Sequence, residues 1–129
     1  MFNIAICDDE TEQLDIMERF IHENMVQSRF LYQVIRFNVG KDLIEGARKE
    51  KISAVFLDID MPEMTGIEVA RELLKENRDI RIFFISNHEE MVFEAIHTRP
   101  MRFIRKNNLI NEMTEAILFL KKELEKTNY

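Results

Sequence analysis

Short apolar segments alternate with helix-like segments five times along this chain of 129 residues. Most of the apolar segments are rich in β-branched or aromatic residues, which is typical of strands buried on both faces of a sheet. The predicted strands are residues 2–7, 31–37, 54–57, 80–86 and 102–105. Apolar residues also recur at helical spacing around residues 14–25, 40–49, 67–74, 91–96 and 109–124. This alternation indicates an α/β fold with an open, doubly wound parallel sheet and helices on both faces.

Composition and charge restrict the class of protein. Hydrophobic residues make up 46% and charged residues 33% of the chain, which is typical of a folded domain in water. No apolar run approaches the length of a membrane span, so we expect no membrane association. The net charge of -6 argues against nucleic-acid binding by this segment alone, because phosphate contacts require a basic face. The absence of a secretion-signal pattern at the N-terminus and the single cysteine, Cys7, favour a cytoplasmic location.

Polar side chains follow four of the predicted strands at the point where each strand ends. Asp8 and Asp9 follow the first strand, Asp58 the third and Lys106 the fifth, while Ser86 ends the fourth. The carboxyl ends of parallel strands meet at one edge of an open sheet, where ligands bind. Three carboxylates brought together there would repel one another by about 4 kcal/mol per pair at roughly 4 Å. The pattern therefore predicts a bound cation, and carboxylate ligands that leave room for water suit Mg²⁺.

The same set of residues suits phosphoryl chemistry. A carboxylate can attack phosphorus and form an aspartyl phosphate. A metal ion would neutralise the developing charge, Lys106 would pair with the phosphoryl group, and the hydroxyl of Ser86 would donate to one of its oxygens.

Four motifs, in order on the predicted strand ends, carry a family resemblance. They read ICDDE (residues 6–10), VFLDIDMPEMTG (55–66), FFIS (83–86) and FIRK (103–106). Together they resemble the receiver domain of bacterial two-component response regulators. The resemblance implies a flavodoxin-like (βα)5 fold with strand order 2-1-3-4-5. It implies a receiver domain over residues 1–125, with residues 126–129 as a C-terminal tail or the start of a linker.

The resemblance also implies how the phosphoryl group is received. Asp58 would accept it from a sensor histidine kinase. Asp8, Asp9 and Asp58 would bind Mg²⁺ together with the backbone carbonyl of Asp60. Ser86 and Lys106 would contact the phosphoryl group, and the domain would act as a signalling module with slow self-hydrolysis rather than as an enzyme.

Further residues would control the output of the switch. Phe103 falls where receivers often carry an aromatic switch residue that acts with Ser86. His88 and Asp60 fall where the family tunes water access to the phosphoryl group. The motifs look most like receivers attached to LytTR-type DNA-binding output domains, so DNA would be contacted only through such a domain. A homodimer through the fourth helix, fifth strand and fifth helix is a further expectation.

Two departures from the family pattern and three alternatives remain. Asn107 stands where the family usually has proline, which puts the usual cis peptide after Lys106 in doubt, and Ser86 replaces the commoner threonine. Asp58 and Asp60 also resemble the D-x-D motif of haloacid-dehalogenase-type phosphohydrolases. A receiver-like module that works unphosphorylated is another alternative. Taken singly, Asp8 and Asp9 are equally typical of helix N-caps.

Overall fold

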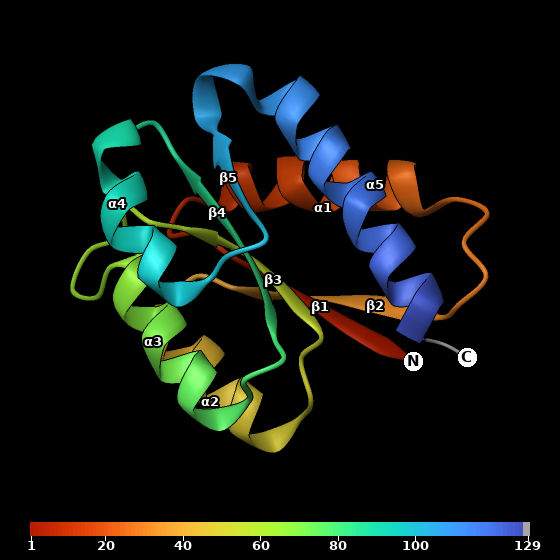
Figure 1. Cartoon of the computed structure of the whole chain (residues 1–129), viewed down its shortest axis with the longest axis horizontal. Helices are drawn as coiled ribbons and strands as arrows, with labels where there is room; N and C mark the ends of the chain where they lie inside the picture. Colours follow the sequence, from red (N-terminus) through yellow and green to blue (C-terminus); the bar gives the residue numbers. More distant parts are fainter. Residues whose placement is uncertain (128–129) are drawn as a thin grey trace.

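Five parallel strands form a single sheet at the centre of the molecule (Figure 1). The structure is a computed structural model, and it describes residues 1–127. The strands are β1 (Phe2–Cys7), β2 (Tyr32–Phe37), β3 (Ala54–Asp58), β4 (Arg81–Ser86) and β5 (Arg102–Arg105). Their order is β2-β1-β3-β4-β5, which confirms the predicted flavodoxin-like topology. Each strand begins and ends within one residue of its predicted boundary.

Helices cover both faces of the sheet. They are α1 (Thr11–Met25), α2 (Gly40–Lys49), α3 (Gly66–Glu76), α4 (Val92–Ala95) and α5 (Leu109–Thr127). On one face α1 and α5 pack over the sheet, and on the other α2, α3 and α4 do so (Figure 1). Within residues 1–127, no helix is both long enough and apolar enough to cross a membrane.

Alternation along the strands sends side chains into two separate cores. In β1, Ile4 and Ile6 pack toward α1 and α5, whereas Ala5 and Cys7 pack toward α2 and α3. All four are completely buried, as expected for a central strand covered on both faces. Burial of this kind is the main source of stability in a domain of this size, at about 25 cal/mol per Å² of apolar surface.

The fourth helix differs from its prediction. We expected a helix across residues 91–96, but only Val92–Ala95 is α-helical, with 3-10 turns on either side at Glu89–Met91 and Ile96–Thr98. Within the α-helical turn only Ala95 is buried. A single turn that buries one small side chain gains little from packing, which accounts for the irregular geometry. The segment ends at Arg99, whose backbone is left-handed with φ of 51°.

Candidate functional site

Three carboxylates lie together at the carboxyl edge of the sheet. β1 and β3 are neighbours, with Cys7 paired to Leu57, so the residues that follow them come side by side. Asp8, Asp9 and Asp58 each place one carboxylate oxygen within 4.8 Å of the other two. Asp8 and Asp58 are each 1% exposed, whereas Asp9 is open to solvent. The structure thus forms the acidic cluster that the strand-end pattern predicts.

Asp58 is paired with the lysine that follows β5. Nζ of Lys106 lies 2.9 Å from Oδ1 of Asp58, and the backbone N–H of Asp60 donates to the same oxygen over 3.3 Å. Burial raises the pKa of Asp58, against the opposing effect of the Lys106 hydrogen bond. Burial disfavours the charge on Lys106, but the hydrogen bond and Coulomb attraction from Asp58 outweigh it and raise the pKa of Lys106. The lysine is therefore a cation held against the buried carboxyl group.

The charge of Asp8 is less well compensated than the charge of Asp58. Oδ1 of Asp8 accepts a hydrogen bond of 2.9 Å from the backbone N–H of Glu10, but its buried Oδ2 has no hydrogen-bond partner within residues 1–127. Burial raises the pKa of Asp8 to about 7 against the effect of the Glu10 hydrogen bond, and the charge of Asp58 raises it further. A buried carboxylate oxygen with no donor, beside two other acids, fits a hard divalent cation such as Mg²⁺.

The helix-cap interpretation of Asp8 and Asp9 is wrong for both residues. α1 begins at Thr11, and its N-cap residue is Glu10, which makes no side-chain cap hydrogen bond. Asp8 accepts from the N-cap residue itself, one position before the helix, and Asp9 accepts no cap hydrogen bond. Neither carboxylate is thus used to begin the helix.

A second cluster of polar side chains borders the acids. The hydroxyl of Ser86, which is completely buried, donates to Oδ2 of Asp60 over 2.9 Å and accepts from the backbone N–H of His88 over 2.9 Å. Nδ1 of His88 lies 2.8 Å from the other Asp60 oxygen. We expected His88 beside Asp60 but did not predict the hydrogen bond between Ser86 and Asp60. Asp60 lies two residues after the end of β3, and His88 lies two residues after the end of the neighbouring strand β4. This shared spacing could have predicted that the loop residues after the two strands come together.

The loop after Asp58 is held by close backbone packing. Thr65 caps α3 through a capping box with Glu68. The next residue, Gly66, packs so closely on the backbone of Asp58 that a Cβ atom there would overlap its carbonyl oxygen. The N–H of Gly66 also donates to the carbonyl oxygen of Ile59 over 3.0 Å. The glycine of the motif therefore fixes the backbone that carries Asp58.

Phe103 lies on β5, in register with Phe84 of β4. It is half-buried and packs, like Met91, against the core that contains Ala95. The next-but-one residue, Arg105, forms ion pairs with Glu112 on α5 and with Glu89 before α4. The peptide after Lys106 is trans, like every other peptide bond in residues 1–127.

Comparisons with known proteins agree on one family. The model of the response regulator receiver domain matches residues 4–118. The chain is 33% identical over 124 residues to the response regulator receiver protein CpdR of Brucella abortus (strain 2308), covering 92% of this chain and 98% of that protein. It is 32% identical over 80 residues to YxjL, an uncharacterized transcriptional regulatory protein of Bacillus subtilis (strain 168), covering 60% of this chain but only 37% of YxjL.

A solved structure gives the same fold. The response regulator protein TrrA of Thermotoga maritima, in complex with Mg²⁺-BeF, superposes with a TM-score of 0.78 at 21% identity. The superposition covers 93% of this chain and 99% of that one.

Proposed function

The chain belongs to the response regulator receiver domain family, and from this premise we propose that it accepts a phosphoryl group on Asp58. The observation that carries the proposal is the pairing of Lys106 with a buried Asp58, beside the acids Asp8 and Asp9. The donor would be a phosphohistidine of a sensor kinase. The modified domain would then control an output.

The transfer is a substitution at phosphorus. A carboxylate oxygen of Asp58 forms a bond to phosphorus while the bond from phosphorus to the histidine nitrogen breaks, and that nitrogen keeps the electron pair. Lys106 holds the carboxylate in place and offers a cation to the phosphoryl oxygens as they arrive. Asp8, Asp9 and Asp58, with the backbone carbonyl of Asp60, would hold Mg²⁺, which would neutralise charge on the phosphoryl oxygens.

Hydrogen bonding around Ser86 suggests how the modification would be sensed. In this structure the Ser86 hydroxyl donates to Asp60. A phosphoryl group on Asp58 brings negative charge close to the Asp60 carboxylate and offers Ser86 a stronger acceptor. Ser86 would turn from Asp60 to the phosphoryl group and draw the loop after β4 with it, and Phe103 would respond to that movement.

Asp60 and His88 would also set the lifetime of the phosphoryl group. Nδ1 of His88 lies 2.8 Å from Oδ1 of Asp60, a contact that would persist when Ser86 turns to the phosphoryl group. The pair would therefore screen the phosphoryl group from water rather than activate water against it.

The phosphohydrolase alternative is not supported. The family match places the chain among receivers, which are signalling domains. In that alternative Asp60 would act as a general acid, but its carboxylate is held by Ser86 and His88.

The proposal also includes a dimer interface, a domain boundary, an output domain and a cellular location. A second copy of the chain would bind through α4, β5 and α5, where Phe93 and Ile96 are 82% and 60% exposed. We propose residues 1–125 as the receiver unit, so a linker from residue 126 would begin in the last turn of α5. DNA would be contacted only through an output domain, of LytTR type by sequence resemblance, and the protein would work in the cytoplasm.

The proposal is tested by incubating the protein with acetyl phosphate, with Mg²⁺ or with EDTA, and measuring its intact mass over time. We expect one phosphoryl group per chain, only with Mg²⁺, that is then lost slowly. The Asp58→Asn variant should stay unlabelled, and its unfolding transition should show that it is still folded like the parent protein. Labelling in EDTA, or sustained turnover of p-nitrophenyl phosphate without a labelled chain, would instead point to a hydrolase.

A further inference from the structure

Glu112 on α5 contacts the chain on both sides of Lys106. Its Oε1 accepts from the backbone N–H of Arg105 over 3.0 Å, and its Oε2 accepts from the side-chain N–H of Asn108 over 3.0 Å. Arg105 immediately precedes Lys106, and Asn108 follows it by two residues. We propose that Glu112 is a positioning residue that holds Lys106 against Asp58. The contacts exist in the unmodified protein, so only their effect on phosphoryl transfer rests on the proposed function.

The backbone at Lys106 lies where the support of the sheet ends. β5 is at the edge of the sheet, beside β4, and its last residue is Arg105. Lys106 then begins a 3-10 turn that ends at Asn108. The backbone N–H of Arg105 donates to Glu112, so removing this acid would leave the N–H without that acceptor. The end of the strand would then be freer to move, and Lys106 would move with it.

The charge of Glu112 strengthens its hold on the backbone. Nε of Arg105 donates to Oε2 of Glu112 over 2.7 Å, and the hydrogen bonds from this side chain lower the pKa of Glu112 against the effect of burial. Glu112 also lies in the first turn of α5, where the helix dipole favours a negative charge. Hydrogen bonds to an ionised acceptor are about twice as strong as neutral ones. A carboxylate therefore fixes the N–H of Arg105 more firmly than a neutral side chain would.

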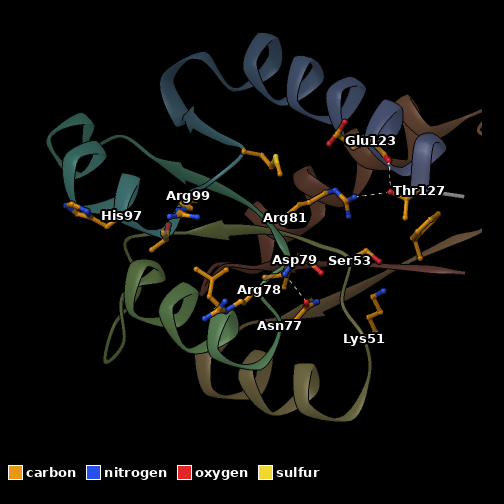
Figure 2. A pocket seen from close by; sticks show the side chains of 15 residues that line it. Lys51, Ser53, Asn77, Arg78, Asp79, Arg81, His97, Arg99, Glu123 and Thr127 are labelled. Atoms are coloured by element: carbon orange, nitrogen blue, oxygen red, sulfur yellow. Dashed lines mark hydrogen bonds between the residues drawn. The ribbon is translucent and has the colours of Figure 1, made fainter.

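The helix that carries Glu112 is a firm support. Three of its side chains are completely buried in the core beneath it, namely Met113, Ile117 and Leu120. At the other end of α5, the guanidinium of Arg81 donates to the hydroxyl of Thr127 over 3.0 Å, as Figure 2 shows. Groups that are held by packed helices keep their geometry better than groups that are held by loops alone.

The reach of Lys106 makes the position of its backbone important. β4 lies between β3 and β5, so Nζ of Lys106 crosses the end of β4 to come within 2.9 Å of Oδ1 of Asp58. A lysine side chain is a long flexible stem, and its ammonium group goes where the backbone lets it reach. A misplacement of about 1 Å can slow a reaction about a hundredfold. Loss of Glu112 should therefore weaken the contact with Asp58 and slow the labelling of Asp58.

An ordinary surface ion pair is the alternative interpretation of Glu112 and Arg105. Exposed ion pairs contribute little to stability, and the side chain of Arg105 is 45% exposed. The side chain of Glu112, however, is only 18% exposed. An ion pair alone does not account for its hydrogen bonds to the backbone of Arg105 and to Asn108.

The first test follows the ammonium signal of Lys106 in the unmodified protein by two-dimensional NMR at low temperature. Asp58→Asn gives the reference for a lost ion pair. In Glu112→Ala the signal should move toward that reference or broaden beyond detection. Glu112→Gln should restore it at least in part, because glutamine keeps one oxygen for the N–H of Arg105. Glu18→Ala is the control, since it removes an acid of α1 that is likewise paired with an arginine, and it should leave the signal unchanged.

The second test measures labelling by acetyl phosphate with Mg²⁺. Glu112→Ala should be labelled about tenfold more slowly than the parent, or slower still. In a Lys106→Ala background the same substitution should have no further effect, because a residue that acts through Lys106 is not additive with its loss. A general loss of stability would instead slow both backgrounds alike. If Glu112→Ala does not fold, Glu112→Asp makes the same tests, since it keeps the charge on a shorter side chain.

Two results would overturn the positioning role. One is an unchanged Lys106 signal in folded Glu112→Ala, whether or not Asp58 is labelled. The other is a slowing by Glu112→Ala that is equally large with and without Lys106. An unlabelled parent whose Lys106 signal is lost in Glu112→Ala would instead support the positioning role and contradict the proposed function.

Discussion

Nζ of Lys106 lies 2.9 Å from Oδ1 of Asp58, although β3, which ends in Asp58, and β5, which precedes Lys106, are not neighbours. β4 separates them, so the lysine reaches across the carboxyl end of that strand to make the contact. Asp58 therefore has a counter-ion within the chain, whereas the buried Oδ2 of Asp8 has no partner in residues 1–127. The two buried acids therefore differ in how far their charge is compensated.

Stability without divalent cations should fall as pH rises through the titration of Asp8. Burial raises the pKa of Asp8 from its ordinary value of 3.8 to about 7, so between these values the folded protein holds a proton that the unfolded chain releases. The free energy of unfolding must then decrease with rising pH, by at most about 4 kcal/mol across this window. Urea unfolding in EDTA at a series of pH values measures this decrease in the free energy of unfolding. Asp8→Asn should flatten the dependence, and parallel curves for the two proteins would contradict the account.

Replacing Gly66 should disturb Asp58 through the backbone. A Cβ atom at position 66 overlaps the carbonyl oxygen of Asp58, so Gly66→Ala should lower the free energy of unfolding by about 2 kcal/mol or more. Gly46→Ala is the matched control, because the new methyl group would meet the movable ring of Phe37 at 2.8 Å. Chemical denaturation of both variants decides the matter, and equal losses would show that the contact with Asp58 has no special weight.

The sequence was sufficient to predict the sheet and the acidic cluster because both depend on periodic patterns. A buried strand such as Ala54–Asp58 is recognisable from its apolar run, and the rule for parallel strands brings its last residue beside Asp8. The direction of the Ser86 hydroxyl was not predictable, because it depends on one side-chain torsion and on the position of Asp60. The irregular segment around α4 was also missed, since the apolar residues Phe93 and Ile96 have helical spacing but face solvent.

The pair formed by Asp60 and His88 should lengthen the life of the phosphoryl group. Nδ1 of His88 lies 2.8 Å from Oδ1 of Asp60, and we propose that this pair shields the site rather than orienting water. The Asp60→Ala, His88→Ala double variant should therefore lose its label several-fold faster than the parent, as followed by intact mass after removal of acetyl phosphate. An unchanged or slower rate would refute the shielding role.

Phosphorylation should promote self-association through α4, β5 and α5. Phe93 is 82% exposed, and burying it against a second copy would favour the dimer. Sedimentation velocity with Mg²⁺ and beryllofluoride should show a dimer for the parent and a monomer for Phe93→Ser. Ser86→Ala should still be labelled by acetyl phosphate but should associate less. A monomeric parent under saturating beryllofluoride would remove this part of the proposal.

The identity of the phosphoacceptor is the central claim, and its most direct test is to locate the acyl phosphate in the chain. Protein labelled with acetyl phosphate and Mg²⁺ would be reduced with borohydride, which converts an aspartyl phosphate to homoserine, and then digested and sequenced by mass spectrometry. We predict homoserine at position 58 alone, with Asp8, Asp9 and Asp60 unchanged. Homoserine at any of those three positions, or its absence from position 58 in fully labelled protein, would contradict the account.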